Sequence, residues 1–314
     1  MKAVHCCKKH VEVVDLPTPS GEGVRVSVHS AGICSSDLHM IAAGFEIGST
    51  MGHEVAGVLS DGTAVALEPI APCGHCDMCV AGDYFLCRLG PGMIHGVGRD
   101  GGMAEQILVP ERCIVTLPSN VSAADACLVE PLAVAAHGIR MLSLTPSSRV
   151  AIVGAGAIGL SAATVLTGHL KEVDIAARHP AQQEAAERLG AGLNPSGEYD
   201  VVIECAGNTA ALESAARLAK PGGTILLLAT YWEGVMLPAM EVSMKNLKIF
   251  ASSLYGRSGL VRDVDVAAQI MSARPEIADI LITHRLPLGS AAEAFDIASK
   301  RDRGSIKVVL DPRV

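Results

Sequence analysis

Four cysteines with short, regular spacing offer the most specific chemistry in the sequence. They lie in the stretch PCGHCDMCVAGDYFLC, which contains Cys73, Cys76, Cys79 and Cys87. Two-residue gaps allow a tight turn to present successive thiolates to one metal ion, and the longer gap before Cys87 lets the chain return to complete a tetrahedron. Four sulfur ligands leave no open coordination position, so the pattern predicts a structural zinc site. A redox-active CxxC pair or a set of buried thiols is the alternative interpretation.

A second set of metal-binding side chains is spread more widely along the chain. The stretch GICSSDLH supplies Cys34, Ser36, Asp37 and His39, GHE supplies His53 and Glu54, and CLVEPLAVAAHG supplies Glu130. One thiolate, one imidazole and one carboxylate can hold zinc with a fourth position open to water or substrate. Such a metal lowers the pKa of a bound alcohol or polarises a carbonyl, while Asp37 could orient the ring of His53. Each residue alone is more often packed or solvated, and only the combination predicts a catalytic site.

A glycine-rich turn between a strand and a helix predicts a dinucleotide site. The stretch RVAIVGAGAIGLSAATVL places an apolar strand at 149–153 directly before Gly154, Gly156 and Gly159, and a helical pattern after them. Glycine at these positions allows the tight turn, the close approach to a pyrophosphate and tight packing of the helix on the strand. The phosphates would lie at the positive end of the helix.

Strands and helices continue to alternate after this turn. We expect strands at 173–177, 199–207 and 224–230, and helices at 180–191 and 209–223. Strands interleaved with helices are typical of a parallel, doubly wound sheet.

The composition is that of a soluble globular protein long enough for two domains. The chain has 314 residues, of which 49% are hydrophobic and 18% charged. A formal net charge of −8 argues against nucleic-acid binding, which needs a concentrated basic surface. No apolar run reaches the roughly 18 residues of a membrane span, and the first residues lack the apolar core of a secretory signal. We therefore expect a cytoplasmic protein whose partner is a small molecule, with no nucleic acid and no membrane.

In chain order, these pieces closely resemble the medium-chain zinc-dependent alcohol dehydrogenase family. The resemblance extends over nearly the whole chain, from GICSSDLH and GHE through the four-cysteine lobe, VEPLAVAAHG, VGAGAIG and LGA to the closing GSIKVVLDP. It implies an α/β protein with a GroES-like, partly β-barrel catalytic domain and a doubly wound Rossmann domain with a parallel sheet. The expected boundaries are 1–143 for the catalytic domain, with its zinc lobe at about 73–87, then 144–270 for the Rossmann domain and 271–314 for the return segment to the catalytic domain.

The same resemblance assigns the metal ligands. It implies that Cys34, His53 and Glu130 hold a catalytic zinc ion. Glu54 is then a neighbouring carboxylate that can exchange into the coordination shell. Together with the four-cysteine site, about two zinc ions per chain are expected.

The implied activity is hydride transfer between a nicotinamide cofactor and a secondary alcohol, a polyol or the corresponding carbonyl compound. Ser36 and His39 are the implied proton relay. Glu130 stands where many alcohol dehydrogenases have a second cysteine, which resembles the polyol and sorbitol dehydrogenase branch of the family. Relatives form dimers and tetramers, so we expect a homodimer or homotetramer.

The end of the second strand of the nucleotide-binding unit bears on the choice between NAD and NADP. In Rossmann units that prefer NAD, an acidic side chain there binds the adenosine ribose and repels a 2′-phosphate. By the family pattern, that position falls on Ala177, and Asp174 lies earlier on the strand. Arg178 offers a guanidinium fork suited to a phosphate and His179 a second donor, so NADP(H) is expected over NAD(H). The alternative is that both side chains are solvated residues before a helix that begins at Pro180.

Two other functions stay open at this point. One is an NAD-dependent polyol dehydrogenase of the same family, and the other is a catalytically silent binding or structural protein with this fold. A zinc-free quinone-type reductase is disfavoured because it should lack both sets of cysteines. Metal analysis separates a zinc-dependent dehydrogenase, a silent protein and a quinone-type reductase. About two zinc ions per chain fit the dehydrogenase, one fits the silent protein and none fits the quinone reductase.

Overall fold

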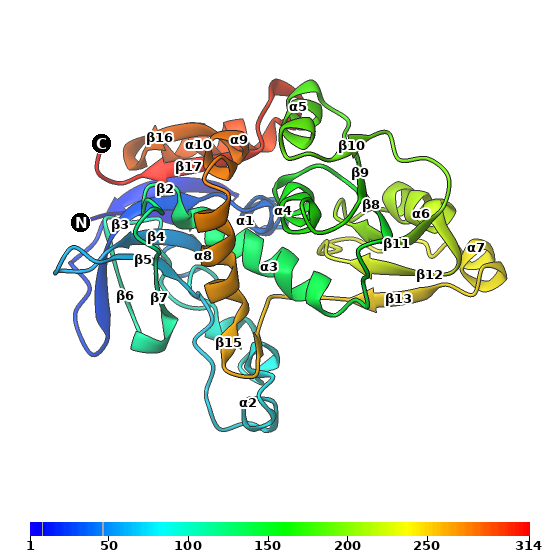
Figure 1. Ribbon diagram of the computed structural model, residues 1–314. Helices are drawn as coiled ribbons and strands as arrows, with labels where there is room; N and C mark the ends of the chain where they lie inside the picture. Colours follow the sequence, from blue (N-terminus) through cyan, green and yellow to red (C-terminus); the bar gives the residue numbers. More distant parts are fainter. Residues whose placement is uncertain (8, 46) are drawn as a thin grey trace. The chain divides into compact units, whose positions relative to one another are not determined.

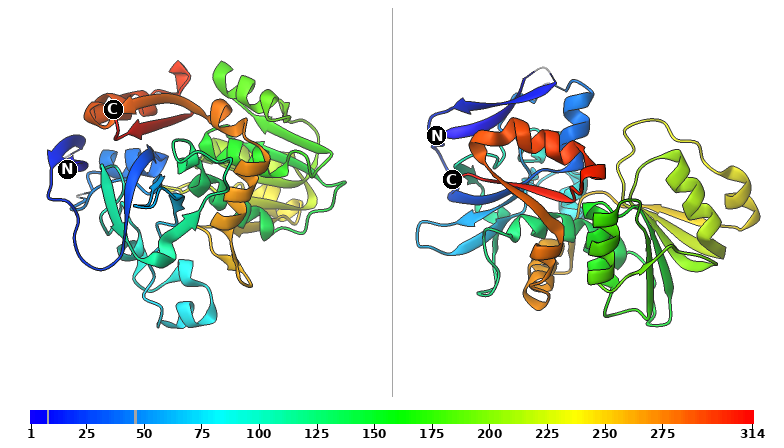
Figure 2. Two further views of the ribbon diagram at one scale, coloured as in Figure 1. Left: turned by 60° about the vertical axis from the view of Figure 1, so that its left-hand side comes forward. Right: turned by 90° about the horizontal axis from the view of Figure 1, so that it is seen from above.

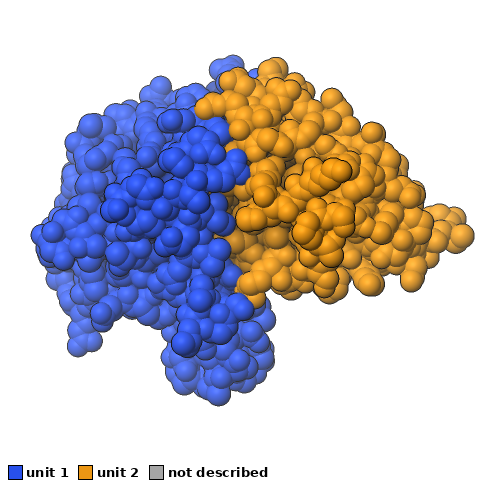
Figure 3. Space-filling view, in the orientation of Figure 1, with its two compact units in different colours: residues 1–130, 256–314 blue, residues 131–255 orange. Residues whose placement is uncertain are grey.

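The structure, a computed structural model, describes residues 1–7, 9–45 and 47–314 (Figure 1). It contains two compact units, which Figure 3 shows in different colours. Unit 1 comprises Met1–Glu130 and Gly256–Val314, and unit 2 comprises Pro131–Tyr255. The domain boundaries expected near residues 144 and 271 stay a prediction. Within the described ranges, none of the helices has the length and apolar character needed to cross a membrane.

Unit 1 is built around a seven-stranded sheet whose strands come from both ends of the chain. The strands are β3 (Val24–Gly32), β4 (Glu54–Val58), β5 (Ala64–Leu67), β6 (Gln106–Val109), β7 (Ile114–Thr116), β16 (Ile282–Pro287) and β17 (Lys307–Asp311). Their order is β16-β17-β3-β4-β5-β7, and β6 also pairs with β3. In the first half of β3, Val26 and Val28 are buried and Arg25 and Ser27 are exposed. This alternation is that of a strand with one face on the core.

Smaller elements complete unit 1. Two strand pairs lie outside the main sheet: β1 (Lys2–Cys7) with β2 (His10–Asp15), and β14 (Arg257–Ser258) with β15 (Val261–Arg262). The helices are α1 (Ser35–Ala42), α2 (Asp77–Ala81), α8 (Asp263–Ala273), α9 (Ile277–Leu281) and α10 (Ala291–Ser299). Short 3-10 helices are η1 (Tyr84–Leu86), η2 (Gly90–Met93), η3 (Glu111–Cys113), η4 (Ala126–Leu128), η5 (Leu288–Ser290) and η6 (Arg301–Arg303). Helix α10 packs on β17, and the two chain ends lie near each other in every view (Figure 2).

Unit 2 is a parallel sheet whose strands alternate with helices. The strands are β8 (Arg149–Val153), β9 (Glu172–Ala176), β10 (Gly192–Leu193), β11 (Tyr199–Glu204), β12 (Ala219–Leu227) and β13 (Lys248–Ala251). The helices are α3 (Val129–Arg140), which begins in unit 1, α4 (Ala157–Leu166), α5 (Pro180–Arg188), α6 (Thr209–Leu218) and α7 (Ala239–Met244). The strand order is β10-β9-β8-β11-β12-β13, and these pairs are parallel. The predicted α/β class with a parallel, doubly wound sheet is confirmed.

Helix α6 covers part of this sheet and ends earlier than the sequence predicts. Its Leu212 and Ala215 are buried in the core of unit 2 against residues of β8, β11 and β12. The helix expected over 209–223 ends at Leu218, and β12 begins at the next residue. Pro221 disfavours helical backbone in the residue before it. The ammonium group of Lys245 donates to three carbonyl groups at this helix end, which stabilises the early stop.

Candidate functional site

The four regularly spaced cysteines converge in unit 1. The sulfur of Cys76 lies 3.5 Å from that of Cys79 and 3.9 Å from that of Cys87. The sulfur of Cys73 lies 3.9 Å from that of Cys79, and all four lie within 4.8 Å of one another. A tetrahedron with zinc–sulfur bonds of about 2.3 Å places its sulfur atoms about 3.8 Å apart. The cluster therefore has the dimensions of a zinc–thiolate site, and the backbone N–H of Arg88 helps to lower the pKa of Cys76 to about 6.

Tyr84 ties this cysteine lobe to the body of unit 1. Its hydroxyl donates a 2.5 Å hydrogen bond to the buried carboxylate of Glu68, which directly follows β5. Glu68 also accepts from Arg112 at 3.1 Å and from Arg262 at 3.3 Å. The Arg112 guanidinium lies 4.8 Å from the centre of the Tyr84 ring, a favourable cation–π distance. Local sequence patterns do not reveal this network, because Glu68 and Arg262 are 194 residues apart.

Cys34, His53 and Glu54 form a second group of metal-binding side chains in unit 1. One ligand atom of each lies within 4.8 Å of the others. Cys34 directly precedes α1, whereas Glu54 begins β4, and the pairing of β3 with β4 brings the two segments together. A thiolate, an imidazole and a carboxylate are all zinc ligands. The donor atoms present here therefore fit a zinc ion.

Two residues of α1 surround the ring of His53. Asp37 is fully buried, and its Oδ1 lies 3.6 Å from Nδ1 of His53. Its other oxygen accepts the backbone N–H of Cys34 at 3.0 Å. On the opposite side of the ring, Oγ of Ser36 lies 3.3 Å from Nε2 of His53. Burial by itself lowers the pKa of His53, but the Asp37 carboxylate raises it well above its usual value.

Glu54 has a buried partner that sequence reasoning missed. Both of its carboxylate oxygens accept from Nζ of Lys307, at 2.6 and 2.5 Å, and neither side chain is more than 2% exposed. Lys307 is the first residue of β17 and also donates to the carbonyl of Ile33 at 3.1 Å. A Cβ on Gly32 would lie 2.2 Å from Oε2 of Glu54, so only glycine leaves room for the pair. Burial lowers the pKa of Lys307, but the Glu54 carboxylate overrides this and raises it to about 12.

Glu130 and His39 lie outside the group of three. Glu130 is the second residue of α3 and is buried, and its charge helps to raise the pKa of His53. His39 lies on α1 and is exposed. The structure brings Glu54 within 4.8 Å of both Cys34 and His53. The assignment of Glu130 as a zinc ligand stays a prediction.

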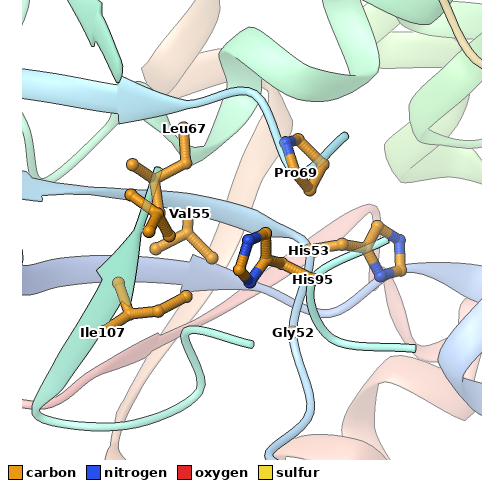
Figure 4. Close-up of a pocket in the computed structure, with 8 residues that line it drawn as sticks. Gly52, His53, Val55, Leu67, Pro69, His95 and Ile107 are labelled. Carbon is orange, nitrogen blue, oxygen red and sulfur yellow. The ribbon is translucent and has the colours of Figure 1, made fainter. Parts of the chain in front are cut away.

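A small apolar hollow lies beside the same group. Figure 4 shows His53 and His95 next to the apolar side chains of Val55, Leu67 and Ile107. The hollow is too small for a water molecule, so it packs side chains and cannot hold a substrate. Among the described residues, Nε2 of His95 has no hydrogen-bond partner, and burial lowers the pKa of this histidine. The ring is therefore neutral where it faces apolar atoms.

In unit 2, the glycine-rich turn has the geometry of a phosphate site. Gly154 has a φ of +107°, which side-chain-bearing residues rarely adopt. A Cβ on Gly159 would lie 1.8 Å from the carbonyl oxygen of Gly154, so helix α4 can approach β8 only with glycine there. A Cβ on Gly156 would meet open space, with no non-neighbouring atom of the described residues within 4 Å. The backbone at the start of α4 is therefore accessible to a ligand's phosphate groups.

The residues predicted to recognise the adenosine ribose directly follow β9. Ala177 and His179 are half-buried, and Arg178 is exposed. The backbone N–H of His179 donates to the side chain of Gln182 at 3.3 Å, which stabilises the start of α5. No ion pair of Arg178 is found among the described residues. Asp174 is engaged elsewhere, because it accepts a 2.7 Å hydrogen bond from the hydroxyl of Tyr199.

Comparisons with known proteins agree with this arrangement. The family model of the alcohol dehydrogenase GroES-like domain matches residues 20–119, and that of the zinc-binding dehydrogenase matches residues 154–269. A protein of Neosartorya fischeri named probable D-xylulose reductase A is 31% identical over 326 aligned positions, which cover 91% of this chain and 89% of the relative.

Two solved structures cover 99% of this chain and 99% of their own chains at 28% identity. One is the alcohol dehydrogenase RspB from Escherichia coli CFT073 in complex with NADH, with a TM-score of 0.86. The other, from Sinorhizobium meliloti 1021, is bound to NADP and has a TM-score of 0.83. The match extends over both units. The protein therefore belongs to the zinc-binding, medium-chain alcohol dehydrogenase family, with the GroES-like and Rossmann-type fold of that family.

Proposed function

We propose that this protein is a zinc-dependent oxidoreductase that transfers a hydride between NADP(H) and a secondary alcohol, a polyol or the corresponding carbonyl compound. The observation that carries the proposal is the group of Cys34, His53 and a buried carboxylate, in the same unit as a separate four-cysteine cluster. One closed and one open donor set are what a structural and a catalytic zinc ion require. The similarity to a relative named for D-xylulose, a ketose, favours a polyol or the matching ketose as substrate.

We assign Glu130 as the third ligand of the catalytic zinc. Glu54 is less available, because both of its oxygens are held by Lys307. Glu130 is buried, and its charge helps to raise the pKa of His53. Glu54 then stays beside the coordination shell and enters it only when the Lys307 pair opens.

Different residues of the chain have different roles in the reaction. Zinc at this site would supply Lewis-acid chemistry, lowering the pKa of an alcohol and polarising a carbonyl. Asp37 orients the His53 ring and keeps it in place. The alcohol gives its hydroxyl proton to Ser36, which passes a proton on through His39 to solvent. A nicotinamide bound in unit 2 would supply the hydride acceptor, so that oxidation of the alcohol would give a carbonyl compound, a reduced cofactor and one proton.

The relay predicts a large kinetic effect for one hydroxyl group. We expect Ser36→Ala to lower kcat for alcohol oxidation at least about a hundredfold, the usual size of general acid–base catalysis. Ser35→Ala is the matched control, because the Ser35 hydroxyl is bonded to Arg301 at 2.9 Å and should leave kcat nearly unchanged. His39→Ala should cost less, and higher pH should restore part of the rate because solvent base can replace an outer relay member. An unaltered kcat in Ser36→Ala would remove Ser36 from the relay.

The cofactor preference rests on the end of β9. Ala177 offers no carboxylate to bind ribose hydroxyls or to repel a 2′-phosphate. Asp174, the nearest acid on the strand, is held by Tyr199 and by close packing against Gly192. Arg178 is exposed and can take a phosphate with two parallel hydrogen bonds. His179 adds a second donor, so this end of the site favours NADP.

We therefore expect the unmodified enzyme to prefer NADP over NAD by at least about tenfold in kcat/KM, which corresponds to about 1.4 kcal/mol. The double change Ala177→Asp with Arg178→Ser should reverse the preference, because it removes the phosphate's partner and adds a repelling charge. Arg188→Ser, at the other end of α5, removes the same charge and should leave the ratio unchanged. Steady-state kinetics with both cofactors measure the ratio of kcat/KM in the unmodified enzyme, in the double variant and in Arg188→Ser. Equal or better use of NAD by the unmodified enzyme would show that Arg178 does not bind a phosphate.

We also propose that the protein is a homo-oligomer, joined through the free edge of β13. This strand ends the sheet of unit 2, and its Ile249 and Phe250 are 36% and 44% exposed. The neighbouring α7 exposes Met240 and Met244 by 73% and 78%. An exposed apolar edge strand is a site of strand pairing unless it is covered. The molar mass in solution, measured by light scattering, tests whether the chain is a dimer or tetramer.

A substrate screen combined with metal analysis tests the proposed function itself. Polyols, simple secondary alcohols and ketones are each assayed with both nicotinamide cofactors. We expect turnover of a polyol or ketose and about two zinc ions per chain. A protein with one zinc ion and no turnover would instead be a silent member of the fold.

A further inference from the structure

A buried carboxylate at the end of β11 has no role in the site described so far. Glu204 is the last residue of this strand and is 0% exposed. Among the described residues, no lysine, arginine or histidine forms an ion pair with it. A buried carboxylate without a cationic partner needs hydrogen bonds to stabilise it, because its burial is otherwise unfavourable.

Three donors from two loops stabilise the Glu204 carboxylate. Its Oε1 accepts the backbone N–H groups of Ala206 at 2.7 Å and Gly207 at 2.8 Å. Its Oε2 accepts the hydroxyl of Tyr231 at 2.6 Å. Hydrogen bonds to an ionised acceptor are short and roughly twice as strong as neutral ones. The side chain therefore fastens the loop after β11 to the segment after β12.

The same loops pack closely on the glycine-rich turn. A Cβ on Gly154 would lie 3.0 Å from the Cβ and 3.1 Å from the nitrogen of Ala206. A Cβ on Gly207 would lie 3.0 Å from the carbonyl oxygen of Thr230, the residue before Tyr231. Three loops at the carboxyl ends of β8, β11 and β12 are thus in contact through backbone atoms. Open α/β sheets bind their ligands at this edge.

We propose that Glu204 and Tyr231 are positioning residues for the nicotinamide cofactor, an inference that rests on the proposed function. Neither side chain needs to touch the cofactor. Glu204 sets the distance between the loop at Ala206 and the segment at Tyr231, and the loop at Ala206 in turn supports the turn at Gly154. The carboxylate therefore preorganises the cofactor-binding edge of the sheet, and its loss weakens cofactor binding more than it slows the chemical step.

Two variants test this role by direct binding. Tyr231→Phe leaves Oε2 of Glu204 without its hydroxyl donor and frees the segment after β12. We expect the Kd of NADPH, measured by calorimetry, to rise at least about tenfold, the size of one lost hydrogen bond to a charged group. kcat at saturating cofactor should stay within about twofold. Glu204→Gln is the conservative variant. Its side-chain oxygen can still accept both backbone N–H groups, and its amide can donate to the hydroxyl of Tyr231. This variant should therefore keep most of the affinity for NADPH.

Lys245→Met is the matched control for a general loss of stability in unit 2. Lys245 donates to the carbonyl groups at the end of α6, at the opposite edge of the sheet from Glu204. It should lower the melting temperature without changing the Kd. The chain's single tryptophan, Trp232, directly follows Tyr231 and reports on this segment. Its emission maximum should shift in Tyr231→Phe and not in Lys245→Met.

The outcomes separate the inference from the proposed function. An unchanged Kd in Tyr231→Phe, or an equal loss of affinity in Lys245→Met, would overturn the positioning role. The proposed oxidoreductase function would be unaffected by either result. Titration is repeated with NADH, so that the result does not depend on the cofactor preference. An unmodified protein that binds neither nucleotide would overturn the proposed function and this inference with it.

Discussion

Replacing Cys34 with serine should lower kcat/KM by at least about a thousandfold and leave the protein folded. The change removes the thiolate from the group of Cys34, His53 and a carboxylate. Lewis-acid stabilisation of the transition state by the metal is worth several kcal/mol. Each 1.4 kcal/mol or so corresponds to about a tenfold change in rate. Zinc content should fall by about one ion per chain. Turnover assays, circular dichroism and metal analysis of the same preparation check the three parts of the prediction.

Two other cysteines provide the controls for this experiment. Cys6→Ser changes a half-buried thiol outside both metal groups, and it should keep both activity and zinc content. Cys76→Ser should instead lower the melting temperature before it alters the chemistry, because a four-thiolate site contributes mainly folding energy. A folded Cys34→Ser protein that keeps more than about 1% of the activity would contradict the catalytic assignment.

Replacing Lys307 with methionine should lower the free energy of unfolding by about 3–5 kcal/mol, the range for breaking a buried ion pair. Methionine fills much of the same space but leaves the Glu54 carboxylate buried without a cation. Because Glu54 adjoins His53, zinc content should be measured along with stability. Urea unfolding of the unmodified protein and the variant measures the difference.

A second ion pair of the same region provides the comparison. Arg313 pairs with Asp311 at 2.6 Å, but its side chain is 44% exposed, so Arg313→Met should cost less than about 1 kcal/mol. Adding Glu54→Gln to Lys307→Met should restore part of the lost stability, since the unpaired charge is then absent. If Lys307→Met were no more harmful than Arg313→Met, the buried pair would not be a main support of this unit.

Local patterns were sufficient for several parts of the structure. The glycine-rich turn between β8 and α4 and the alternation of strands and helices depend on residues a few positions apart, so periodicity and glycine placement predict them. The four-cysteine cluster follows for the same reason, since its ligands come from one short segment. The end of α6 was predicted wrongly because Pro221 and Lys245 stop the helix, and Lys245 acts from a distant helix end.

The sequence by itself thus determined the family, the parallel α/β class and the residues able to bind metal and phosphate. Only the tertiary structure decided which buried carboxylates are bonded to another side chain, and to which one. Glu54 is paired with Lys307 across 253 residues of chain, Glu68 with Arg262 across 194, and Tyr231 reaches Glu204 from another loop. Sequence spacing cannot predict such pairs. Strand order and register decide which donor lies beside a buried carboxylate, and both depend on the whole sheet.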